Sequence, residues 1–164
     1  MVQDRKITQR DLIALSSGIW RNMTDVSYFD VVKDMRRLRP FFLSLQDKRV
    51  VEIGPGNRPV NAHYRCNGYI SAPGYPNDGL TVLSREPARS AVVVSFGVLD
   101  DSILGGNASR QGPRDLAKQY IEELVLEIRR VANPFSIIIG LDAEKYVGAP
   151  DIEAAGAGGV YFNK

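Results

Sequence analysis

A short apolar run that ends in two glycines constrains the fold of this chain more than any other feature. The run is Val50-Val51-Glu52-Ile53, and Gly54-Pro55-Gly56-Asn57 follows it directly. Consecutive β-branched residues predict a buried strand, and two glycines spaced by one residue predict a turn where the backbone comes close to another group. In an open α/β sheet, ligands bind outside the carboxyl ends of the strands, so this turn is the first candidate site.

The second half of the chain predicts a parallel pair of strands. Residues 91–96 form the clearest β-branched run and indicate a central strand buried on both faces. Residues 115–131 carry one apolar stripe at helical spacing, with acids early and bases at the end, which favours a helix. Residues 135–142 form another strong strand pattern. A strand, a helix and a strand with short connections predict a parallel pair joined by a right-handed crossover.

The remaining segments are weaker. We expect helices over residues 8–20 and from Phe29 to Phe42, the second kinked or divided at Pro40 because proline cannot donate a helical hydrogen bond. A short helix is expected within residues 59–66 and short strands over 68–71 and 80–83. We interpret the chain as one domain, with helices over 1–47 packing on the sheet, a core over 48–142 and an irregular Ala/Gly-rich tail over 143–164. Within that tail, residues 160–162 are expected to return as an edge strand.

Composition excludes several classes of protein. The 164 residues are 44% hydrophobic and 24% charged, which is ordinary for a globular domain, and the net charge of +2 gives no signal for nucleic acid or an anionic membrane. A single cysteine, Cys66, and a single histidine, His63, exclude an internal disulfide and a Cys/His zinc cluster. No signal peptide or membrane-spanning run is evident, so we expect a cytoplasmic protein without a membrane partner or a metal.

Three segments, taken in order, resemble the class I S-adenosylmethionine-dependent methyltransferases. Residues 50–56 resemble the first strand and glycine loop of that family, and residues 91–101 its fourth strand and following loop. Residues 127–139 resemble the helix end, proline turn and fifth strand. The resemblance implies a three-layer α/β/α sandwich with a mostly parallel, Rossmann-like sheet, shortened at its C-terminal end. It also implies S-adenosylmethionine as cofactor, S-adenosylhomocysteine as product, and an unidentified methyl acceptor.

The resemblance also implies a set of cofactor-binding residues. Glu52 would serve the ammonium end of the cofactor, and the glycine loop its amino-acid carboxylate. The loop after the family's third strand would lie at the adenine edge, and the end of the fourth strand would line the pocket. The full set is Glu52, Gly54, Pro55, Gly56, Asn57, Asp78, Gly79, Ser95 and Phe96. No catalytic residue can be selected from the sequence.

Structural interpretations of these residues stay open. Glu52 could be a buried strand acid that pairs with Lys48 or Arg58. The glycines and Asn77-Asp78-Gly79 could be tight turns, and Phe96 could belong to the core.

The chain also departs from the family pattern. Ser71 and Ala72 stand where the family usually has an acid for the ribose hydroxyls, and Arg58 stands where many members have a third glycine. The alternative is therefore a non-catalytic methyltransferase-like domain that acts as a binding or oligomerisation subunit, with a second copy covering a sheet edge. A nicotinamide-dinucleotide domain is disfavoured, because Pro59 occupies the position of that fingerprint's last glycine.

Overall fold

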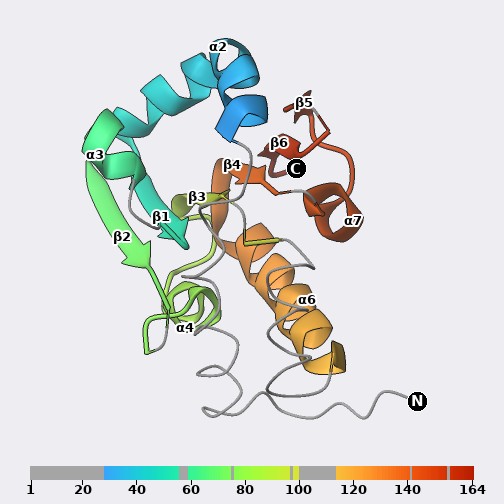
Figure 1. The fold of residues 1–164 in the computed structure, drawn as a ribbon. Coiled ribbons are helices and arrows are strands. Elements are labelled where there is room, and N and C mark those ends of the chain that lie inside the picture. Colours follow the sequence, from blue (N-terminus) through green and yellow to red (C-terminus); the bar gives the residue numbers. More distant parts are fainter. Residues whose placement is uncertain are drawn as a thin grey trace.

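A computed structural model of the chain describes residues 28–55, 59–74, 76–96, 98–99, 114–140, 142–154 and 156–164. The described residues form an α/β fold around one six-stranded mixed sheet, with the strand order β2-β1-β3-β4-β6-β5 (Figure 1). The strands are β1 (Arg49–Ile53), β2 (Gly68–Ala72), β3 (Ala91–Phe96), β4 (Ala132–Ile139), β5 (Ile152–Glu153) and β6 (Gly158–Phe162). The helices are α2 (Tyr28–Ser44), the 3-10 turn η1 (Leu45–Asp47), α3 (Val60–Tyr64), α4 (Gly79–Ser84), α6 (Arg114–Val131) and α7 (Ala143–Val147).

The first four strands of the sheet run parallel. β1 pairs with β2 on one side and with β3 on the other, and β3 pairs with β4. The chain therefore goes from β1 to β2 in one direction across the sheet and then continues from β3 on the opposite side of β1. This confirms the predicted parallel strand–helix–strand unit, since α6 lies between β3 and β4 in the chain.

Side chains of the central strands alternate between two apolar clusters. Val51, Ile53 and Val93 belong to the cluster that α4, α6 and α7 complete. Val92 and Val94 belong to the opposite cluster, with buried residues of α2, η1 and α3. In Figure 1, α2 lies above the strands, and α4 and α6 lie below them. The prediction of a central strand buried on both faces is thus confirmed, because residues 91 to 94 are at most 2% exposed.

Helix α2 is longer than expected. It continues through Pro40 to Ser44 instead of dividing there, and Leu38 and Phe42 in its C-terminal part are buried.

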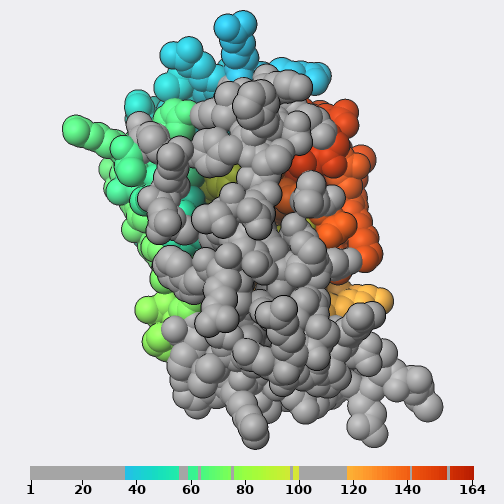
Figure 2. Space-filling view, viewed as in Figure 1, coloured from blue at the N-terminus to red at the C-terminus, as the bar shows by residue number. Residues whose placement is uncertain are grey.

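The surface view shows α2 at the upper margin of the molecule and the segment from α7 to β6 at its right margin (Figure 2). The helix expected over residues 8–20 lies outside the described residues. No helix within the described residues is both long enough and apolar enough to cross a membrane.

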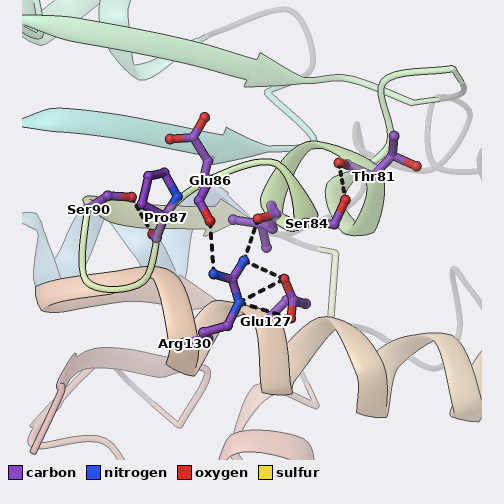
Figure 3. A network of polar contacts seen from close by, with 8 residues as sticks. Thr81, Ser84, Glu86, Pro87, Ser90, Glu127 and Arg130 are labelled. Atoms are coloured by element: carbon purple, nitrogen blue, oxygen red, sulfur yellow. Dashed lines mark hydrogen bonds and ion pairs between the residues drawn. The ribbon is translucent and has the colours of Figure 1, made fainter.

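Residues 80–83 form a helix, so the strand expected there is wrong. Asp78 caps the N-terminus of α4 through the Thr81 N–H, and Val82 and Leu83 are both buried, which is helical rather than alternating burial. At the other end, the Arg130 guanidinium of α6 donates to the carbonyl oxygens of Leu83 at 2.8 Å and Glu86 at 2.9 Å (Figure 3). Because these bonds satisfy carbonyls at and just beyond the end of α4, they fix this short helix on α6.

The tail also differs from the irregular segment that we expected. It contains α7, β5 and β6, and β6 lies inside the sheet, antiparallel to both β4 and β5. A Cβ atom at Gly159 would collide with the carbonyl oxygen of Ile152, so glycine is what allows this hairpin to close. Gly159 is therefore a condition for this pairing. The end of the sheet formed by β4, β6 and β5 is antiparallel, so the sheet is mixed and only its other end is parallel as expected.

Candidate functional site

The candidate site lies where β1 and β3 end side by side. The chain leaves β1 toward β2 on one side and returns on the other side with β3, so the strand order reverses between these two strands. Loops that leave parallel strands at such a reversal diverge and leave room for a ligand at the carboxyl ends. The residues that follow β1 and end β3 are the ones that the sequence selected.

Gly54 begins the loop after β1 in a conformation that favours glycine. Its φ angle is 64°, in the left-handed region, and it is buried. Its N–H donates to the carbonyl oxygen of Ala72 at the end of β2, at 3.0 Å. The loop is thus tied to the neighbouring strand at its first residue, and Pro55 follows half-buried. Gly56, Asn57 and Arg58 lie outside the described residues.

Glu52 is a buried carboxyl with a one-sided set of hydrogen bonds. The side chain is 1% exposed. Its Oε2 atom accepts from the Val60 N–H of α3 at 2.8 Å and from the Tyr69 hydroxyl of β2 at 2.5 Å. Within the described residues no hydrogen bond reaches Oε1, and Lys48 is not a partner. One oxygen of the carboxyl is held by two elements, and the other is left for a further donor.

Burial also changes the acidity of this carboxyl. Desolvation raises the pKa of Glu52, and the hydrogen bonds from Tyr69 and Val60 lower that pKa and so oppose it. Burial raises the pKa of Tyr69, and the neighbouring Glu52 raises it further. The ion pairs among the described residues do not include Glu52. A cationic group at Oε1 would favour the ionised form, so the arrangement suits the binding of a positively charged ligand.

Asp78 is a second buried acid, and it has a complete set of partners. It is 2% exposed. Oδ1 accepts from the Thr81 hydroxyl at 2.5 Å, and Oδ2 accepts from the Tyr120 hydroxyl at 3.1 Å and from the Thr81 N–H at 3.3 Å. These bonds make Asp78 the N-cap of α4, where the sequence had offered a cofactor contact or a tight turn.

Gly79 keeps this helix end against the end of β1. A Cβ atom at Gly79 would lie 2.9 Å from Cγ2 of Ile53 and 3.1 Å from Cδ1 of Leu124. A side chain at this position would therefore push α4 away from β1 and α6. The close approach places the N-terminus of α4 beside the candidate site.

The end of β3 contributes two different environments. Ser95 is fully buried between its strand partners Ile53 and Ile138, and its Oγ has no hydrogen-bond partner among the described residues. Phe96 instead stacks on Phe42 of α2, with 5.9 Å between ring centroids, in agreement with the core interpretation. The predicted residues therefore divide between the two faces of the sheet. Glu52 and Phe96 lie on the α2–α3 face, and Asp78, Gly79 and Ser95 on the α4–α6 face.

Sequence reasoning missed the two tyrosines that hold the acids. Tyr69 reaches Glu52 from β2, where Ser71 is the register partner of Glu52, so the contact is diagonal. Tyr120 lies on the apolar stripe of α6, and the stripe gave no sign that its hydroxyl would bind Asp78. Only a known strand register for Tyr69, and a known helix placement for Tyr120, could have identified them.

Two further features of the site are settled by geometry. Ala72 ends β2 as a buried residue whose carbonyl oxygen is used by Gly54, and Ser71 precedes it, so an acid is absent from the end of this strand. Among the described residues, no three His, Cys, Asp or Glu side chains are placed to hold a metal ion.

Comparisons of the chain with protein-family models, with curated proteins and with solved structures give no match.

Proposed function

We propose that this chain binds S-adenosylmethionine at the carboxyl ends of β1 and β3 and transfers its methyl group to an acceptor that is still to be identified. The observation that carries the proposal is the position of Glu52 and Gly54 at the strand-order reversal. There, a buried carboxyl with one unused oxygen precedes a loop that begins with a left-handed glycine. Both features come from the segment on which the resemblance to class I methyltransferases was first based.

The topology supports the same proposal. The three segments of the resemblance lie in β1, β3 and the α6–β4 unit, and these strands are adjacent and parallel. Dinucleotide-binding sheets have the strand order 3-2-1-4-5-6. The series β2-β1-β3-β4 corresponds to 2-1-4-5 in that order, with α4 in place of the third strand. Helices on both apolar faces agree with a three-layer, Rossmann-like arrangement.

The residues of the site fit the chemical groups of the cofactor. Oε1 of Glu52 would accept from the ammonium group, and the backbone of the loop from Gly54 to Asn57 would approach the carboxylate. The unpartnered Ser95 hydroxyl offers a buried polar group at the end of β3. Asp78 and Gly79 would act through the position of α4, and Phe96 through packing on Phe42. Bound there, the cofactor supplies an electrophilic methyl group on a sulfonium.

Calorimetric titration of S-adenosylmethionine and S-adenosylhomocysteine tests the proposal. We expect both to bind the wild type, and we expect Gly54→Ala and Glu52→Gln each to weaken binding at least tenfold. Two matched controls should bind normally. Gly148→Ala introduces the same side chain at another glycine of positive φ with open space around it. Glu86→Gln makes the same substitution in a buried acid that pairs with Arg49 before β3 begins.

The outcomes separate the proposal from its alternative. Absence of binding by folded wild-type protein would overturn it. Binding without formation of S-adenosylhomocysteine, when oxygen, nitrogen and sulfur nucleophiles are offered as acceptors, would favour the non-catalytic methyltransferase-like subunit instead. In that case the sedimentation behaviour of the protein should be measured next, because a second copy is a candidate partner.

A further inference from the structure

We infer that Tyr69 is the positioning residue of this site, and that it holds the Glu52 carboxylate so that Oε1 receives the cationic amino group of the ligand. The inference rests on the proposed function and extends it to a residue that the resemblance did not select. Tyr69 does not touch the ligand in this arrangement. It acts through Glu52.

The hydrogen bonds show how the carboxyl is oriented. The Tyr69 hydroxyl and the Val60 N–H both donate to Oε2, at 2.5 and 2.8 Å, and they come from β2 and α3. Two donors from two separate elements fix both the position and the rotation of the carboxyl group. Since they use the same oxygen, Oε1 is presented in one direction without competition from the described residues.

Asp78 shows that a purely structural acid in this fold is satisfied differently. Its two oxygens accept three hydrogen bonds, from Thr81 twice and from Tyr120 once, and neither oxygen is left over. Glu52 is buried as deeply as Asp78 and its tyrosine hydroxyl is closer, at 2.5 Å against 3.1 Å, but one of its oxygens lacks a donor among the described residues. Among the described residues, Ser95 Oγ is the buried side-chain atom without a partner, so Oε1 of Glu52 keeps some access from outside the protein and a ligand donor can reach it.

Tyr69 also influences whether the carboxyl is ionised. Burial raises the pKa of Glu52, and the Tyr69 hydrogen bond opposes that rise because it stabilises the charged form. Among the described residues, the titratable groups that interact with Glu52 are Tyr69 from β2 and Cys66 from the segment between α3 and β2. A ligand ammonium group needs the carboxylate, so its affinity should rise with pH as Glu52 loses its proton.

The test uses Tyr69→Phe and its matched control Tyr120→Phe, each of which removes one hydroxyl from a buried acid. Titration calorimetry with S-adenosylmethionine at a series of pH values gives the affinity and the pH at which it rises. We expect Tyr69→Phe to weaken binding about tenfold and to move the rise to higher pH, because the Glu52 pKa increases further. We expect Tyr120→Phe to change neither. In ligand-free protein, the Glu52 carboxyl carbon observed by NMR should titrate at higher pH in Tyr69→Phe than in the wild type.

Each outcome decides something. Wild-type binding with an unchanged affinity and pH profile in Tyr69→Phe would overturn the inference and leave the proposed function standing. Equal losses in both tyrosine variants would also overturn it, since that result indicates general loosening. Failure of the folded wild type to bind would overturn the proposed function itself, and the ligand role of Tyr69 with it. Should Tyr69→Phe not fold, Glu52→Asp withdraws the carboxyl from both donors while keeping its charge, and normal affinity in that variant would contradict the inference.

Discussion

Two buried acids, each of which accepts a hydrogen bond from a tyrosine, lie on opposite faces of the same sheet. Glu52 and Tyr69 are on the face of α3, while Asp78 and Tyr120 are on the face of α4 and α6. Both acids are close to the end of β1, because Glu52 belongs to that strand and Gly79 contacts Ile53. The two acids therefore share deep burial, a tyrosine as hydrogen-bond donor and a place near the end of β1.

They differ in how many donors the fold provides. Asp78 receives three hydrogen bonds spread over both oxygens, and two of them come from the helix that it caps. Glu52 receives two hydrogen bonds on one oxygen. The first arrangement is complete and stabilises α4, whereas the second leaves one oxygen without a donor among the described residues. Under the proposed function, the number of donors at each oxygen distinguishes the structural acid from the binding one, where burial alone does not.

The largest expected effect is on the Asp78 side. Asp78→Ala should lower the free energy of unfolding by about 3 kcal/mol, because it removes an N-cap worth about 1 kcal/mol and leaves the buried Tyr120 hydroxyl without its acceptor. Glu52→Ala should cost less, about 2 kcal/mol, because it leaves the buried Val60 N–H without an acceptor but removes no helix cap, and the Tyr69 hydroxyl that it also releases belongs to a half-buried side chain. Urea denaturation of both variants measures the difference.

Asp78→Asn is the control, because asparagine caps a helix nearly as well as aspartate. It should retain most of the stability and bind S-adenosylmethionine as the wild type does. Equal losses of stability in Asp78→Ala and Glu52→Ala would break the distinction between the two acids. Weakened binding in folded Asp78→Asn would show that Asp78 contacts the ligand after all.

The parts of the fold that sequence predicted correctly are those where one local signal dominates. The β-branched run at 91–96 and the long stripe at 115–131 became β3 and α6 with boundaries close to those expected. Residues 80–83 were misassigned, because four residues with alternating character do not distinguish a strand from a helix. The helix is decided by the cap that Asp78 forms with Thr81, three residues away, and by the contact of Arg130 with Leu83, which lies far from it in sequence. The tail was misassigned because glycine was interpreted as a breaker, while Gly159 is needed for close strand approach.

The residues of the candidate site divide in the same way, into those with a local sequence signal and those that depend on contacts between distant elements. Glu52 and Gly54 could be found because they are neighbours in sequence and the turn chemistry is local. Tyr69 and Tyr120 could not, since each is joined to its acid by an element whose placement depends on the whole sheet or on helix packing. The side of the sheet on which each predicted residue lies also depends on the register of β1 with β3, which no local pattern encodes.

A second, smaller effect concerns the pH dependence of stability. The folded-state pKa of Glu52 is raised above its ordinary value of 4.5 by burial. Its contribution to stability is therefore fully present below that ordinary value and is lost as pH rises through the raised pKa. Glu52→Gln carries no charge, so its stability relative to the wild type should improve by about 1 kcal/mol across this window. Thermal unfolding at pH values from 4 upward measures the change, and parallel pH profiles for the two proteins would contradict it.

The smallest expected effect comes from an exposed acid and has the opposite sign. Asp151 accepts a hydrogen bond at 2.7 Å from the Phe162 N–H and pairs with Lys164 at 3.5 Å, and these contacts lower its pKa. The charged Asp151 carboxylate therefore contributes to stability at pH values above the ordinary pKa of an aspartate. That contribution is lost as pH falls through the lowered pKa. Asp151→Asn should therefore lose a little stability at neutral pH and nothing at low pH, because solvent screens the charge. The same thermal unfolding series would detect this pH-dependent loss of stability.

If Asp151→Asn and Glu52→Gln shifted the pH profile of stability in the same direction, the opposite effects of burial and of hydrogen bonding on these two acids would be refuted. An exposed acid that is favoured when charged and a buried acid that is favoured when neutral must diverge as pH rises.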